Sequence, residues 1–155
     1  MLTYVLGAPG SGKTALAPVL RRLLAGCAVI DWDSFMDAAS ELAGRDIRRS
    51  PETWPGYRNL VQVIVDSIRP HPTVLLGVCT PDELRGWPVD SWVLLDCSDE
   101  ERTHRLGMDR AQDLAKALAD ARDYRSLDLP IVDSTGRSPE DVGVAVAALI
   151  RGSLR

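Results

Sequence analysis

The stretch GAPGSGKT, residues 7–14, constrains this chain more than any other feature of its 155 residues. Three glycines and a proline in eight positions exclude a continued strand or a helix interior. An apolar run, residues 2–6, precedes the stretch, and a segment of helical period, residues 13–24, follows it. The stretch satisfies the pattern G-x-x-x-x-G-K-[ST] at every fixed position, and a strand before it and a helix after it are the required context. The sequence therefore predicts a phosphate-binding loop.

The residues of this loop have distinct expected roles. Glycine lets the backbone approach a ligand closely, so that successive N–H groups can point at phosphate oxygens, and the start of the following helix adds unpaired donors. We expect Lys13 to bridge the terminal phosphates of a nucleoside triphosphate and Thr14 to ligate Mg²⁺. The alternative is an ordinary glycine turn with a solvated Lys13. The expected nucleotide-binding residues are Gly7, Ala8, Pro9, Gly10, Ser11, Gly12, Lys13, Thr14 and Ala15.

Short apolar runs alternate with helical segments along the whole chain. The runs are almost uninterrupted, which is typical of parallel strands covered on both faces. With right-handed crossovers, this alternation predicts an α/β fold, a three-layer sandwich around a parallel sheet, in one domain over residues 1–155. The predicted strands are residues 2–6, 27–31, 73–79, 92–97 and 130–133, and the predicted helices are residues 13–24, 34–43, 50–68, 109–127 and 138–150.

Charge and hydropathy exclude several classes of protein. The formal net charge is −4 and there is no block of lysine or arginine, which argues against a nucleic-acid partner. No apolar run approaches the roughly 18 residues of a membrane span, and the first residues lack the basic flank of a signal peptide. We therefore expect a cytoplasmic protein with a small-molecule partner, as a monomer or a homodimer.

The second predicted strand ends in the stretch IDWDSF, which contains two aspartates. Asp31 and Asp33 fall at the carboxyl end of that strand, where open parallel sheets gather their ligands. One carboxylate can hold Mg²⁺ through water while the other orients or deprotonates an acceptor hydroxyl. The alternative is that Asp33 only caps the helix over residues 34–43.

GAPGSGKT, the D-x-D pair and an arginine-bearing segment after the fourth strand together resemble the small P-loop kinases, such as nucleoside monophosphate kinases, shikimate kinase, gluconate kinase and chloramphenicol phosphotransferase. The resemblance implies a five-stranded sheet of order 2-3-1-4-5 and transfer of the γ-phosphate of ATP to a small acceptor. It assigns Asp33 to the acceptor and Asp31 to the metal. Residues 132–141 resemble the loop that lies near the adenine.

The resemblance also assigns roles to arginines in the segment 95–110. It implies that Arg105 stacks on the adenine and that Arg110, in a short lid over about residues 105–112, reaches the transferring phosphate; Arg102 is an alternative for either role. A mobile guanidinium can neutralise charge that develops on the phosphoryl oxygens. The competing interpretation is a solvated helix with ion pairs such as Glu101 with Arg105.

The sequence departs from this family in three respects. The third strand runs into GVCTPDEL, so no acid stands where most P-loop enzymes place their second magnesium carboxylate, and the metal role shifts toward Asp31 or Asp96. There is little room for a full lid after Gly107. The motif that recognises a nucleoside monophosphate is not identifiable between the second and third strands.

Residues 34–69 form the expected acceptor-binding insert. They contain several arginines, of which Arg49 and Arg58 are the candidate substrate ligands, together with Trp54 and Tyr57. Arginines can grip a carboxylate or phosphate with two hydrogen bonds, and aromatic rings can stack on a planar group. This composition favours an acidic or ring-bearing metabolite. The alternative is a solvated RDIRRS turn with Trp54 in the core.

The sequence thus predicts an ATP- and Mg²⁺-dependent kinase of a small acceptor that bears a hydroxyl or an acidic group, including nucleotides and nucleosides. A regulatory or accessory NTPase that binds a partner protein is the alternative. A binding module without catalysis is a third possibility, because the acid after the third strand is missing. A concave pocket beside Asp33 would favour the kinase, whereas a flat apolar patch there would favour the regulatory protein.

Overall fold

The computed structural model describes residues 1–107 and 111–153. Their strands form one parallel sheet whose order is β2-β3-β1-β4-β5, so the predicted topology is confirmed. In register, Leu2 of the central strand lies opposite Thr73, and Thr3 lies opposite Ser91 on the other side. The strands are β1 (Leu2–Leu6), β2 (Ala28–Asp31), β3 (Thr73–Gly77), β4 (Ser91–Asp96) and β5 (Ile131–Asp133).

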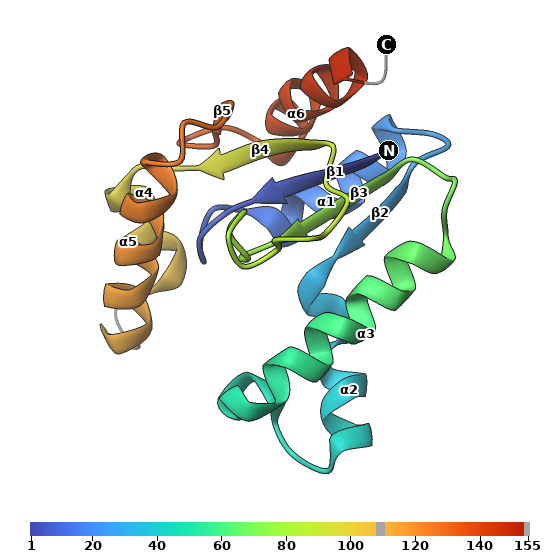
Figure 1. Ribbon diagram of the computed structural model, residues 1–155. Coiled ribbons are helices and arrows are strands. Elements are labelled where there is room, and N and C mark those ends of the chain that lie inside the picture. The colour runs from blue at the N-terminus through green and yellow to red at the C-terminus, as the bar shows by residue number, and fades with distance from the viewer. Residues whose placement is uncertain (108–110, 154–155) are drawn as a thin grey trace.

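Helices cover both faces of this sheet (Figure 1). Figure 1 shows α2 and α3 extending from the end of β2, with α4 and α5 on the opposite side of the molecule, beyond the end of β4. The helices are α1 (Lys13–Leu23), α2 (Met36–Ala43), α3 (Trp54–Ser67), α4 (Asp99–Leu106), α5 (Ala111–Arg125) and α6 (Pro139–Ser153), with short 3₁₀ turns at Trp32–Phe35, Ile47–Arg49 and Pro51–Thr53.

The core consists of two apolar layers, one on each face of the sheet. Successive side chains of a strand point to opposite faces, so Tyr4 packs in one layer and Val5 in the other. The first layer joins the sheet to α3 and α5 through residues such as Val61 and Ala121. The second layer joins the sheet to α1 and α6. This arrangement confirms the predicted three-layer sandwich.

Element boundaries differ from the prediction mainly within residues 34–69. The predicted helix over residues 50–68 begins with a 3₁₀ turn, and α3 itself starts at Trp54, directly before Pro55. Proline is favoured in the first turn of a helix because its missing N–H would have no partner there. The predicted helix over residues 34–43 likewise starts as the 3₁₀ turn Trp32–Phe35, which changes where the two aspartates point.

Candidate active site

The phosphate loop leaves the carboxyl end of β1 and runs directly into α1. Gly10 and Gly12 adopt φ of 80° and 100°, the left-handed region that other residues rarely occupy. Gly7 is needed for a different reason. A Cβ at that position would lie 2.5 Å from Ser11 Oγ and 2.9 Å from the carbonyl oxygen of Leu95. The glycines therefore fix a loop that packs closely against β4 and turns sharply into the helix.

Backbone N–H groups of this loop are free to bind a ligand. Within the described part of the chain, the amides of Gly10, Gly12, Lys13 and Thr14 donate to no protein acceptor. These residues, together with Ala15, line a cavity of about 410 Å³ that we call the loop cavity. Unpaired donors at a helix N-terminus form a favourable site for anions.

The carbonyl groups of residues 7–11 in the same loop, in contrast, all contact cations. Lys13 Nζ donates to the carbonyls of Gly7 and Ala8, at 2.5 and 3.3 Å. Two arginines of α4 complete the set. Arg102 donates to the Pro9 carbonyl, and Arg105 Nη1 lies 3.3 Å from the carbonyl oxygens of both Gly10 and Ser11. Five successive carbonyls are thus paired with three cations.

Lys13 is one of two buried cations at this site, with 8% of its surface exposed. Burial lowers the pKa of Lys13 from 10.5 to about 8, although the nearby carboxylates of Asp33 and Asp31 act in the opposite direction. Burial disfavours the charged form of a lysine, and an added anion restores it. A polyphosphate in the loop cavity would therefore meet a lysine whose protonation responds to it.

The structure gives the two aspartates of the D-x-D pair different roles. Asp31 is buried, and its Oδ1 accepts a hydrogen bond from the Asp33 amide at 3.1 Å, so Asp31 caps the turn Trp32–Phe35. Asp33 does not cap α2: that helix begins at Met36, its capping position is occupied by Phe35, and no side chain makes a capping bond there. The Asp33 carboxyl instead lines the loop cavity, and desolvation there raises its pKa, with Lys13 opposing the shift.

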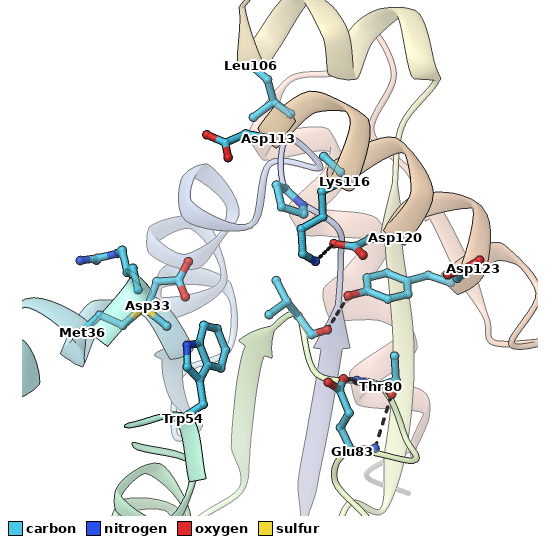
Figure 2. Close-up of a pocket in the computed structure, with 15 residues that line it drawn as sticks. Asp33, Met36, Trp54, Thr80, Glu83, Leu106, Asp113, Lys116, Asp120 and Asp123 are labelled. Carbon is cyan, nitrogen blue, oxygen red and sulfur yellow. Dashed lines mark hydrogen bonds and ion pairs between the residues drawn. The ribbon is translucent and has the colours of Figure 1, made fainter. Parts of the chain in front are cut away.

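A second, larger cavity of about 710 Å³ adjoins the loop cavity, and we call it the acceptor cavity. Pro9, Asp33 and Val78 line both cavities, so Asp33 lies at their boundary. Figure 2 shows Asp33, Met36 and Trp54 on one side, with Lys116 and Asp120 of α5 across from them. The arrangement places a carboxylate between a phosphate-binding loop and a concave space large enough for a small metabolite.

The structure brings some of the predicted substrate residues to this cavity and leaves others outside it. Trp54 lines the acceptor cavity and is half-buried, so it is neither a pure core residue nor a solvated one. Arg49 has 89% of its side chain exposed and lies 3.6 Å from Asp46. Arg58 donates to the carbonyl of Glu83 at 2.9 Å, and neither arginine lines the cavity.

The arginines predicted to act after the fourth strand lie in different environments. Arg105 lines the loop cavity and also donates to Ser134 Oγ and the Ser134 carbonyl, in the loop after β5. Arg102 is fully buried and pairs with Asp96, which also pairs with Arg125. The Asp96 carboxylate is therefore paired with two arginines. Arg110 lies outside the described residues.

Residues of α5 and of the segment after β3 line the acceptor cavity, although the sequence analysis assigned them no function. Thr80 and Glu83 follow β3, and Tyr124 of α5 donates to the Val78 carbonyl. The one local signal for the α5 residues is their spacing, since residues 113, 117, 120 and 124 recur every three or four positions. The remaining residues of this wall are Asp113, Lys116, Ala117, Asp120 and Asp123.

The oxygen groups near the loop suit Mg²⁺. Within residues 1–107 and 111–153, no three His, Cys, Asp or Glu side chains form a metal cluster. Mg²⁺ does not require one, since it usually keeps several waters and binds one or two protein groups plus substrate phosphates. Thr14 and Asp33 line the loop cavity, and Asp31 is close enough for its charge to act on Lys13, so all three offer oxygen atoms of this kind near the loop.

Three solved structures of similar fold span nearly all of this chain. TT1252 from Thermus thermophilus is 24% identical, with a TM-score of 0.65, over 98% of this chain and 97% of that one. Shikimate kinase from Acinetobacter baumannii, in complex with shikimate, is 20% identical, with a TM-score of 0.68, over 97% and 93%. A gluconokinase from Sinorhizobium meliloti is 18% identical, with a TM-score of 0.67, over 97% and 91%.

These likenesses confirm the predicted fold, a five-stranded parallel sheet of order 2-3-1-4-5 flanked by helices, which the chain shares with the shikimate kinase and the gluconokinase. The chain matches no protein-family model, and its sequence matches no curated protein. No helix within the described ranges combines the length and the hydropathy that a membrane crossing requires.

Proposed function

We propose that this chain is an ATP- and Mg²⁺-dependent kinase that transfers the γ-phosphate of ATP to a hydroxyl group of a small molecule. The proposal depends above all on the position of Asp33, at the boundary between the loop cavity and the acceptor cavity. A kinase must hold two substrates side by side, with a group that handles the acceptor proton between them. A regulatory NTPase needs no such second cavity.

The phosphate loop would bind ATP through the residues already described. The free amides of Gly10, Gly12, Lys13 and Thr14 would donate to phosphate oxygens, with Gly7, Ala8, Pro9, Ser11 and Ala15 shaping the loop around them. Lys13 would turn from the loop carbonyls to the terminal phosphates. Thr14 and Asp31 would hold Mg²⁺, which supplies charge neutralisation of the phosphate oxygens when bound.

Asp33 would orient the acceptor hydroxyl and take its proton. In the reaction, the acceptor oxygen forms a bond to the γ-phosphorus, the bond from that phosphorus to the bridging oxygen of ADP breaks, and the hydroxyl proton moves to the Asp33 carboxylate. A carboxyl with a raised pKa is better suited to accept this proton than an ordinary aspartate. The charge of Lys13 opposes this shift and favours the ionised form of Asp33.

Arginines would complete the site. Arg105 lines the loop cavity and is therefore placed to contact bound nucleotide. Arg110 keeps the role of the lid arginine, as the resemblance to small P-loop kinases implies. Residues 34–69 would serve as the acceptor-binding insert, which is supported by Met36, Arg48 and Trp54 in the wall of the acceptor cavity.

Single-turnover transfer of labelled γ-phosphate to a panel of metabolites tests this proposal. We expect Asp33→Asn to slow transfer by about 10²–10⁴-fold, which is typical for the loss of a general base. The dissociation constant of ATP should change far less. Asp82→Asn is the matched control, because Asp82 is exposed, pairs with Arg85 and lines neither cavity. Undiminished transfer in the Asp33 variant would remove Asp33 from the mechanism.

A further inference from the structure

The wall of the acceptor cavity carries an excess of negative charge. Its carboxylates come from three separate parts of the chain: the turn after β2, the segment after β3 and helix α5. The excess is therefore not a solvated stripe on one helix. The charged side chains that line the cavity are the acids Asp33, Glu83, Asp113, Asp120 and Asp123, and the bases Arg48 and Lys116.

Both bases in the wall already have acidic partners. Lys116 Nζ lies 2.8 Å from an oxygen of Asp120, in the same wall. Arg48 Nη1 lies 2.5 Å from an oxygen of Asp37, which does not line the cavity. Among the residues that the structure describes, the cavity thus offers an incoming acceptor no unpaired guanidinium or ammonium group.

The other arginines of residues 34–69 add no positive charge to the wall of the cavity. Arg45 lies 3.0 Å from Glu52, and the contacts of Arg49 and Arg58 are those given above. Of the insert's arginines, only Arg48 lines the cavity. The composition of residues 34–69 suggested an acidic or ring-bearing acceptor, but the charged residues that line the folded cavity are mostly acidic.

Helix α5 directs its acids at the cavity for a structural reason. Ala121 and Tyr124 are buried in the first core layer, and this packing fixes the rotation of the helix. Asp113 and Asp120 lie on the adjoining face, at helical spacing, and Figure 2 shows Asp120 turned toward the cavity beside Lys116. The core therefore holds the carboxylates in place.

We propose that the acceptor is a hydroxyl compound that carries at least one protonated amine. This proposal rests on the proposed kinase function and names the substrate class of the same cavity. An ammonium group would pair with the wall carboxylates, and the indole of Trp54 offers a face for a cation. A carboxylate acceptor such as shikimate, to which the kinase from Acinetobacter baumannii is bound, would meet like charges instead.

Binding of three matched sugars to the full chain tests the charge preference without relying on catalysis. The probes are glucosamine, glucose and glucuronic acid, which share a ring and hydroxyl groups but are cationic, neutral and anionic at pH 7. We expect isothermal titration calorimetry to show that glucosamine binds about tenfold or more tightly than glucuronic acid. Equal binding, tighter binding of glucuronic acid, or no detectable binding of either would overturn the proposal.

Asp120→Asn sharpens this measurement, since it removes one acid and releases Lys116 from its ion pair. We expect the preference for glucosamine over glucuronic acid to fall by about tenfold in this variant, and to stay unchanged in the Asp82→Asn control. An unchanged preference in Asp120→Asn would show that the wall does not select the acceptor by charge.

Transfer of labelled phosphate to cell metabolites then separates this proposal from the kinase proposal. A metabolite extract is divided by ion exchange into cationic, neutral and anionic pools, and each pool is incubated with the protein, Mg²⁺ and labelled ATP. Labelling confined to the cationic pool supports both proposals. Labelling confined to the neutral or the anionic pool overturns the amine and leaves the kinase intact. No labelling in any pool contradicts the kinase function, while the sugar titrations still decide the charge preference.

Discussion

Raising the pH from 7.5 to 9 should weaken ATP binding through one residue, Lys13. Its pKa in the folded protein is lowered to about 8 by burial. At pH 9 about nine-tenths of these side chains would be neutral before ATP binds, against about a quarter at pH 7.5. The negative charge of the bound polyphosphate should raise the pKa again and return the proton to Lys13. Binding then carries a proton, and its free energy depends on pH.

The size of this effect follows from linkage between the two equilibria. If the bound lysine stays protonated throughout, the ATP dissociation constant should rise about eightfold between pH 7.5 and pH 9. Proton uptake should be about one half per ATP at pH 8 and about nine-tenths at pH 9. The terminal phosphate of ATP, whose second pKa is about 6, is already ionised in this range and does not contribute.

Calorimetric titration of ATP with excess Mg²⁺ measures both quantities when it is repeated in buffers of different ionisation enthalpy. Lys13→Met is the control: its ATP affinity should be weaker, and the proton uptake should disappear. Asp33→Asn removes a carboxylate that raises the pKa of Lys13, so the pH step should move to lower pH. Equal proton uptake in the wild type and in Lys13→Met, or none in the wild type at pH 9, would refute this reasoning.

Two further substitutions test the construction of the loop. Gly7→Ala should destabilise the fold by about 2 kcal/mol and weaken ATP binding, because its Cβ would crowd Ser11 Oγ and the backbone of β4. Gly56→Ala is the matched control, because this glycine lies in a helix with open space around it. That variant should be neutral or stabilising by up to about 1 kcal/mol. Arg102→Met should cost about 3 kcal/mol in urea unfolding, because this fully buried arginine pairs with Asp96. A loss of unfolding free energy below about 1 kcal/mol would contradict the conclusion that the buried pair of Arg102 with Asp96 stabilises the fold.

The parts of the site that the sequence predicted are those whose geometry is local. GAPGSGKT dictates its own backbone through glycines and through the helix that starts at Lys13, so the loop could be placed before the fold was known. The strand order came from the resemblance to small P-loop kinases rather than from any residue pattern. The D-x-D pair was placed correctly after β2.

The parts that it did not predict depend on packing between distant elements. A cap on the helix over residues 34–43 was the alternative to the acceptor role of Asp33. The structure instead shows Asp31 making a capping bond, to the 3₁₀ turn that begins at Trp32. Arg49 was a candidate substrate ligand, but only the folded insert shows that it lies in solvent. The acidic wall of α5 depends on helix rotation against the sheet, which a single sequence does not reveal.

The pairing of five loop carbonyls with three cations has a consequence for how nucleotide is captured. Arg102 and Arg105, both from α4, contact carbonyls in the middle and at the end of this run, whereas Lys13 contacts its start. In the proposed function Lys13 would leave these carbonyls to reach phosphate, while the two arginines would continue to hold the loop. A braced loop needs little ordering when ATP arrives, so capture should lose little conformational entropy in the backbone. Nucleotide binding would then move the Lys13 side chain and leave the backbone of the loop unchanged.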